Sequence, residues 1–71
     1  MGYVKEIGDK VREQRLLRGW SQEELAKRTG LSSGHISEIE NGQRKNLQAR
    51  TVKNLSRALE VRVSVLLGID D

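Results

Sequence analysis

The fold is decided by residues 20–42, which read WSQEELAKRTGLSSGHISEIENG. Ser21 and Glu24 are spaced as a capping box, in which a serine hydroxyl and a glutamate carboxylate satisfy backbone amides at a helix start. Gly30 follows the basic pair Lys27 and Arg28 by two residues, and glycine readily takes the left-handed conformation that ends a helix. We therefore predict a short helix that begins at Gln22 and ends before Gly30.

The second half of this stretch repeats the pattern. Ser32 is the next candidate N-cap, and Ile36 and Ile39 follow on one helix face until an Asn-Gly pair closes the segment. This pattern predicts a helix over residues 33–40. Two short helices joined by a short turn that contains glycine form a helix-turn-helix, which we expect over residues 21–41.

The flanking segments also have helical spacing. Apolar residues three or four apart predict a first helix over residues 5–18 and a fourth helix over residues 49–59. Residues 61–65 alternate apolar and polar and would favour a strand, but a lone strand in a helical chain has nothing to pair with. We therefore expect a turn and a short fifth helix over residues 64–67, and an all-α fold in one compact domain that spans residues 1–71.

The composition excludes several classes of protein. A chain of 71 residues without cysteine has no disulfide and no thiolate zinc site. Its apolar runs are too short to span a membrane, so we expect a soluble, cytoplasmic protein. His35 is the only histidine, and no nucleophile with a base, carboxylate pair or phosphate-binding glycine loop occurs at workable spacing. We expect no enzymatic activity, no metal, no cofactor and no small-molecule ligand.

Positive charge is concentrated in one part of the chain. The formal net charge is +3, from 13 Lys and Arg against 10 Asp and Glu. No acidic residue lies between Glu40 and Glu60, whereas this segment holds Arg44, Lys45, Arg50, Lys53 and Arg57. Such a segment fits a polyanion or a solvated helix face, and composition alone does not separate the two.

Three segments together resemble a known family. Residues 20–26, 30–32 and 36–42 are similar to the helix-turn-helix of Cro and phage-repressor-like (XRE-type) regulators, and parts of residues 7–15 and 51–67 resemble the family's other helices. The resemblance implies a five-helix, lambda-repressor-like DNA-binding domain. It also implies a sequence-specific regulator of transcription, a repressor, whose third helix enters the major groove of double-stranded DNA.

The resemblance assigns roles to individual residues. Base readout falls to polar residues on the third helix, namely Ser33, Gly34, His35, Ser37 and Glu38. Several relatives carry glutamine at positions 33, 34 and 38, so no base preference is carried over. Because Glu38 only accepts hydrogen bonds, we expect it to favour C·G. DNA phosphates are expected to contact Gln22, Ser32, Asn41, Gln43, Arg44, Lys45 and Arg50.

Two further features complete the expected site. Arg15 and Glu40 match an ion pair of the family that orients the recognition helix, although they could also be two independent surface charges. The chain is expected to form a homodimer on a palindromic operator, through Val63, Val65, Leu66 and Ile69 of the apolar tail. Ordinary burial of that tail under the fourth helix is the alternative. The alternative function is an antitoxin or controller-type module that mainly binds a protein partner.

Overall fold

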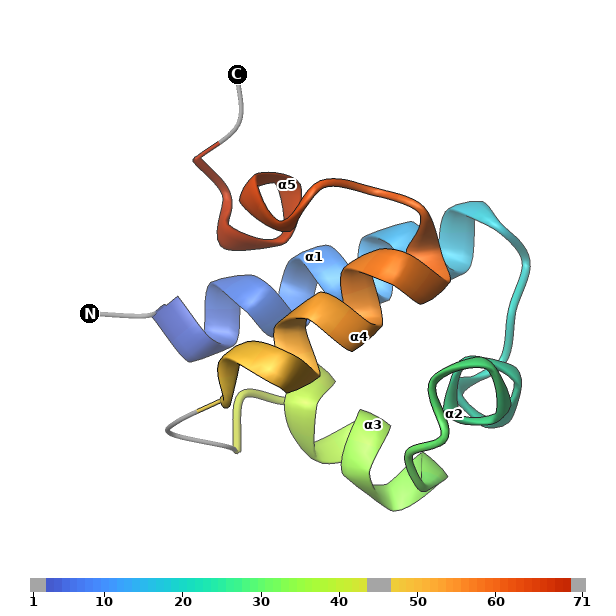
Figure 1. Cartoon of the computed structure of the whole chain (residues 1–71). Helices are drawn as coiled ribbons and strands as arrows, with labels where there is room; N and C mark the ends of the chain where they lie inside the picture. Colours follow the sequence, from blue (N-terminus) through green and yellow to red (C-terminus); the bar gives the residue numbers. More distant parts are fainter. Residues whose placement is uncertain (1–2, 44–46, 70–71) are drawn as a thin grey trace.

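Five α-helices make up the described part of the chain, residues 3–43 and 47–69 of a computed structural model, and these residues contain no strand (Figure 1). The helices are α1 (Tyr3–Leu17), α2 (Gln22–Thr29), α3 (Ser33–Glu40), α4 (Ala49–Leu59) and α5 (Val63–Leu67). The predicted bounds of α2, α3 and α4 are confirmed. Helix α1 begins two residues before the predicted start and ends one residue earlier, and α5 begins one residue earlier than predicted. No helix in these residues is long and apolar enough to cross a membrane.

Side chains and glycine set the ends of the two central helices. The hydroxyls of Ser21 and Ser32 accept hydrogen bonds from the amides of Glu24 and His35, each at 3.0 Å. Gly30 ends α2 with φ of 78°, a left-handed conformation that costs glycine little. The carboxylate half of the predicted capping box is wrong, because the Glu24 carboxylate instead accepts from Arg28 Nε at 2.8 Å.

The core is a single apolar cluster to which every helix contributes. Helix α1 packs against α3, α4 and α5, and α2 packs against α3 and α4. In Figure 1, α5 lies on the opposite side of α1 and α4 from α2 and α3. The buried residues are Ile7, Val11, Leu25, Ala26, Ile36, Ile39, Val52, Leu55, Leu59 and Leu66. The tail of the chain thus closes one side of the domain and leaves α2 and α3 uncovered on the other.

The position of Leu66 corrects the expected dimer interface. Leu66 is fully buried in the core of the single chain, so it is wrong as an interface residue. One helical turn at α5 directs this side chain inward against α1 and α4, whereas the alternating sequence pattern does not distinguish inward from outward positions. Burial of a leucine stabilises the fold by about 1.5–3 kcal/mol, which attaches the short α5 to the domain.

Helix α1 and the end of α3 approach each other at Gly8. A Cβ atom on Gly8 would lie 2.2 Å from the carbonyl oxygen of Ile39 and 2.9 Å from that of Glu40. Both neighbours are backbone atoms, which cannot rotate away as a side chain can. The absence of a side chain at this position therefore permits the two helices to come this close.

We expect Gly8→Ala to lower the free energy of unfolding by about 3 kcal/mol, because the added methyl group forces α1 and α3 apart. Urea denaturation followed by circular dichroism measures this change. Gly34→Ala is the matched control, since the nearest atom to its added Cβ is Ser32 Oγ at 3.9 Å. That variant should be unchanged, or more stable by up to about 1 kcal/mol. Equal stability of the two variants would contradict the close approach.

Candidate nucleic-acid interface

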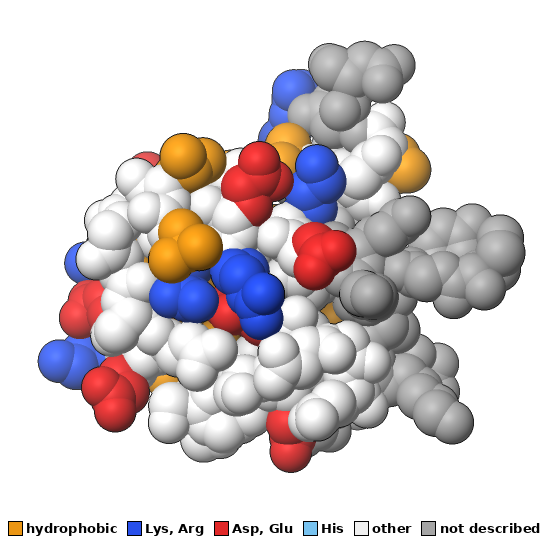
Figure 2. Space-filling view, turned by 180° about the vertical axis from the view of Figure 1, so that it is seen from behind, with side chains coloured by type: hydrophobic (Ala, Val, Ile, Leu, Met, Phe, Trp, Pro, Cys, Tyr) orange, Lys and Arg blue, Asp and Glu red, His pale blue; other side chains and the backbone are white. Residues whose placement is uncertain are grey.

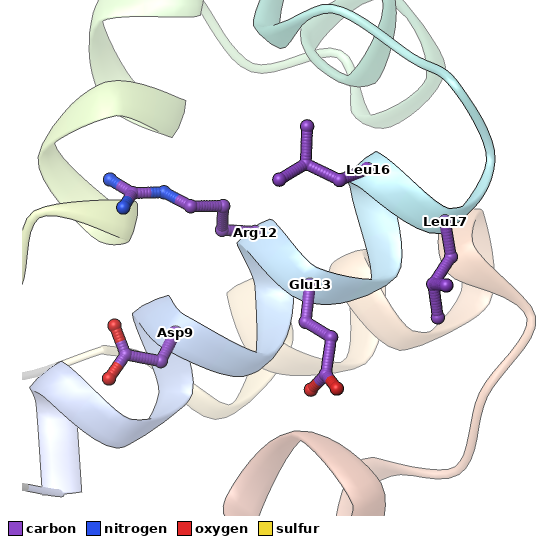
Figure 3. Close-up of a pocket in the computed structure, with 5 residues that line it drawn as sticks. All are labelled: Asp9, Arg12, Glu13, Leu16 and Leu17. Atoms are coloured by element: carbon purple, nitrogen blue, oxygen red, sulfur yellow. The ribbon is translucent and has the colours of Figure 1, made fainter.

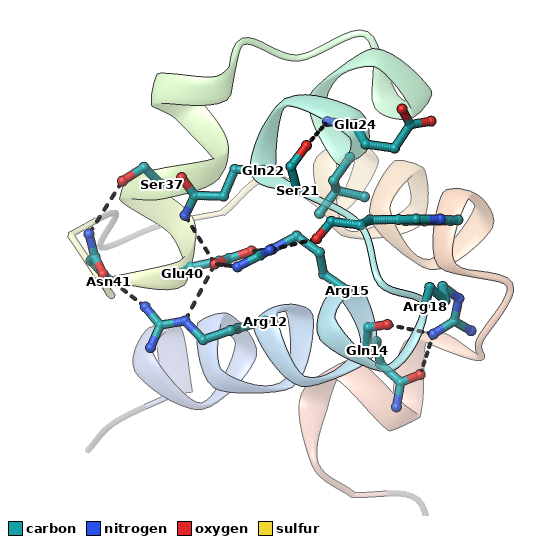
Figure 4. A network of polar contacts seen from close by, with 12 residues as sticks. Arg12, Gln14, Arg15, Arg18, Ser21, Gln22, Glu24, Ser37, Glu40 and Asn41 are labelled. Atoms are coloured by element: carbon teal, nitrogen blue, oxygen red, sulfur yellow. Dashed lines mark hydrogen bonds and ion pairs between the residues drawn. The ribbon is translucent and has the colours of Figure 1, made fainter.

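A buried carboxylate lies where α1, α2 and α3 meet. Glu40, the last residue of α3, is 2% exposed. Arg15 of α1 donates to it from Nε at 2.7 Å and from Nη2 at 2.9 Å, so the ion pair expected between these residues is present (Figure 4). Gln22 Nε2 donates to the same carboxylate at 3.1 Å, and Arg12 Nε donates at 3.4 Å. One carboxylate thus connects α3 to both α1 and α2.

The surroundings of Glu40 keep it ionised. Burial raises its pKa, but the hydrogen bonds from Arg15, Gln22 and Arg12 together with the charge of Arg15 outweigh burial, so the pKa is lowered below its ordinary value of 4.5. The pKa of Arg15 is raised by its hydrogen bond to Glu40, against the opposing effect of burial. Both partners are therefore charged at neutral pH.

Arg15 also determines the path of the chain between α1 and α2. Its Nη1 donates to the carbonyl oxygen of Trp20 at 2.8 Å. The Trp20 ring lies 4.0 Å from the guanidinium carbon of Arg28 and 5.8 Å from that of Arg18, which are cation–π distances. Trp20 thus contacts Arg15 of α1 and Arg28 of α2. These contacts hold the start of α2 beside Glu40.

Hydrogen bonds continue from this carboxylate to the outer face of α3. Arg12 Nη2 donates to Asn41 Oδ1 at 3.1 Å, and Asn41 Nδ2 donates to Ser37 Oγ at 3.4 Å (Figure 4). Because arginine only donates, it fixes which end of the asparagine amide faces Ser37. We call Ser37, Asn41, Arg12 and Gln22 the polar row. It runs around Glu40 from the middle of α3 to the start of α2.

Sequence reasoning missed Arg12. It lies three residues before Arg15, and residues three apart share one helix face, so this spacing was the available signal. The pairing was hidden because Glu40 and Asn41 are 28 and 29 residues away along the chain.

The structure places the expected readout residues together on α3. Ser33 and Gly34 are exposed in its first turn, and His35, Ser37 and Glu38 are partly exposed. These side chains are short, except for His35 and Glu38. Most side chains on the exposed face of α3 therefore project only a short way from the backbone. This allows the backbone of the helix to come close to a ligand.

The residues expected to contact phosphates differ in their exposure and in the hydrogen bonds that they already make. Ser32 caps α3, and Gln22 uses one amide hydrogen on Glu40, which leaves the other for an external acceptor. Gln43 and Arg50 are exposed. Arg44 and Lys45 lie outside the described residues. Lys53 and Arg57, the other two basic residues of this segment in α4, are exposed.

Val63 and Leu67 of the apolar tail line an open groove. Val63 and Val65 are partly buried, and Ile69 is exposed. Between the start of α4 and α5 the surface is hollowed and mostly apolar, lined by Leu47, Ala49, Val52, Lys53, Val63 and Leu67.

Comparison with known proteins gives one consistent result. The family model described as Helix-turn-helix (HTH_3) matches residues 11–66. The HTH-type transcriptional regulator SinR of Bacillus licheniformis is 31% identical over 65 residues, which are 92% of this chain and 59% of that protein. The uncharacterized HTH-type transcriptional regulator RghRB of Bacillus subtilis is 41% identical over 62 residues, 87% of this chain and 45% of that protein. The chain spans about half the length of the curated relatives it matches.

Solved structures show the same arrangement of helices. The restriction-modification controller protein C.AhdI from Aeromonas hydrophila matches with a TM-score of 0.83 at 33% identity, over 89% of this chain and 94% of that chain. The biofilm master regulator SinR in complex with DNA matches with a TM-score of 0.81 at 31% identity, over 86% of this chain and 97% of that chain.

We expect Arg15→Ala to lower the free energy of unfolding by about 3–5 kcal/mol, because it leaves the Glu40 carboxylate buried without its two-point partner. Urea denaturation at neutral pH measures this loss. Lys10→Ala is the control, since Lys10 and Glu13 form an exposed pair at 3.8 Å and should contribute less than about 0.5 kcal/mol. A loss no larger than that of the control would contradict a structural role for Arg15.

The lowered pKa of Glu40 predicts how stability depends on pH. Its ionised form is favoured in the folded chain, so the stabilisation is present above the ordinary carboxyl pKa of 4.5 and is lost as the pH falls through the lower folded value. The difference in unfolding free energy between the wild type and Glu40→Gln should therefore shrink as the pH falls below 4.5. Urea titrations of both proteins between neutral and acidic pH test this, and a constant difference would contradict it.

Proposed function

The chain belongs to the HTH_3 (XRE-type) helix-turn-helix family, and on that premise we propose that it binds double-stranded DNA in a sequence-specific way and regulates transcription as a repressor. The observation that carries this proposal is the uncovered, polar α3, whose C-terminal end is held against α1 and α2 through Glu40. A helix that is to read bases must keep a constant orientation in the major groove. In this role residues 1–71 act as one unit, with the helix-turn-helix at residues 21–41.

The exposed face of α3 supports a particular kind of readout. The proposed base contacts are Ser33, Gly34, His35, Ser37 and Glu38. Serine reaches either type of base pair, and a glutamate accepts from the amino group of cytosine. Because most side chains on this face are short, we propose that backbone contacts and the local shape of the DNA add to recognition.

Contacts to phosphates supply affinity without sequence information. We propose them at Gln22, Ser32, Asn41, Gln43, Arg44, Lys45 and Arg50. Repression then follows from occupancy, because a protein bound across an operator excludes other proteins from the same DNA. Such a regulator acts in the cytoplasm, in association with the nucleoid.

We further propose a homodimer on a palindromic operator. One short recognition helix contacts few bases, and specific affinity in this class of protein generally comes from two half-sites. The groove between α4 and α5 is mostly apolar and adjoins Val63, while Ile69 is exposed nearby in sequence. The interface proposed for the described residues is therefore Val63, Val65 and Ile69, without Leu66.

One observation favours a second candidate, a controller or antitoxin-type module that binds a protein partner. Leu16 and Leu17 at the end of α1 are 59% and 72% exposed. They line a shallow hollow with Asp9, Arg12 and Glu13, and their side chains leave the helix in different directions (Figure 3). Figure 2 shows apolar side chains beside basic and acidic ones on the molecule's rear surface. Such a mixed surface suits a protein partner more than it suits DNA.

Selection of bound sites from random-sequence duplex DNA tests these proposals together. We expect the bound sites to share two symmetric half-sites with centres about 10 base pairs apart. Ser37→Ala should change the preference at a base pair within each half-site and keep the spacing. Arg57→Ala, which alters an exposed residue of α4, is the control that should change neither. Enrichment of single half-sites would contradict the dimer. Failure to enrich any site would contradict sequence-specific binding and favour the partner-binding role.

A further inference from the structure

The guanidinium of Arg12 lies within the polar row, and we propose that Arg12 contacts a DNA phosphate from a position set by Glu40 and Asn41. This inference rests on the proposed function. Arg12 is within hydrogen-bond distance of Asn41, and it shares the Glu40 carboxylate with Gln22. Its two neighbours in the row are thus proposed phosphate contacts themselves, and Figure 4 shows all three around Glu40.

The charges around Glu40 leave Arg12 with an uncompensated positive charge. Arg15 and Glu40 form a forked pair with bonds of 2.7 and 2.9 Å, which neutralises both. Arg12 reaches the same carboxylate only at 3.4 Å, a weaker contact, and it is the second cation on one anion. The side chain of Arg12 is 44% exposed, whereas that of Arg15 is 10% exposed. The charge that faces outward at this point is therefore that of Arg12.

The guanidinium of Arg12 also has N–H groups that remain available to donate to a ligand. Arginine carries five N–H groups. Nε is directed at Glu40 Oε1 and one Nη2 hydrogen at Asn41 Oδ1, so both Nη1 hydrogens and the second Nη2 hydrogen meet no acceptor in the described part of the chain. These remaining donors lie in one plane, which matches the oxygens of a phosphate. Since the side chain is already held, little rotamer freedom is lost on binding.

A purely structural role for Arg12 makes a different prediction. If Arg12 only supported Glu40, its loss would lower stability and leave the electrostatics of DNA binding unchanged. If it contacts a phosphate, its loss removes one released counterion for each bound chain. The salt dependence of binding distinguishes these roles, and it does so on DNA of any sequence.

The experiment measures binding of the full chain to a fluorescent random-sequence duplex across a range of salt concentrations. For Arg12→Gln we expect the slope of log Kobs against log salt to fall in magnitude by about 0.9 for each bound chain. Arg57→Gln is the matched control, because it removes the same charge from an exposed position on α4 outside the polar row, and its slope should equal that of the wild type. Arg12→Lys keeps the charge without the planar fork, so it should retain most of the slope with an affinity several-fold lower.

The possible outcomes test the role of Arg12 separately from the proposed DNA-binding function. Wild-type binding with equal slopes for the wild type and Arg12→Gln would overturn the role of Arg12 and leave the proposed function standing. Equal losses of slope in Arg12→Gln and Arg57→Gln would also overturn it, because the effect would then be one of net charge alone. No salt-dependent binding by the wild type would overturn both. If Arg12→Gln proves unfolded by circular dichroism, the comparison of Arg12→Lys with the wild type decides, and a lysine variant that binds as tightly as the wild type would overturn the proposal.

Discussion

The rest of the structure depends on the burial of one carboxylate. Taking the charge of Glu40 out of water costs several kcal/mol, and that cost is offset only where donors surround it in good geometry. Arg15 supplies a forked pair from α1, and Gln22 adds a donor from the start of α2. The carboxylate is the last residue of α3, so these bonds also determine how α3 is oriented. Movement of α3 would break several hydrogen bonds to a buried charge.

Gly8 makes this arrangement sterically possible. The backbone of α1 touches the carbonyl groups at the end of α3 at Gly8, one and two helical turns before the arginines that reach Glu40. Because the helices meet this closely, Arg12 and Arg15 approach the carboxylate from the side of α1 while α3 keeps its outer face uncovered. The same side chains that hold α3 in place thus border the surface that it presents.

Several features of the fold were predictable from short-range patterns. The caps at Ser21 and Ser32 and the left-handed turn at Gly30 act within one helical turn, so they appear directly in the sequence. The Arg15 and Glu40 pair came from family resemblance, since the two residues are 25 positions apart. Arg12 had only its spacing from Arg15 as a signal, and its bond to Asn41 depends on how α1 crosses α3.

The sequence by itself therefore determined the number of helices, the bounds of the central ones and the family, because capping and apolar spacing are local properties of the chain. Tertiary structure alone decided which side of each helix faces inward when the local pattern was ambiguous. Leu66 is buried and Ile69 is exposed because α5 packs on α1 and α4 in one orientation, which the alternation of residues 61–65 does not specify. It also decided the partners of Arg12, since long-range contacts form only when distant segments are packed together.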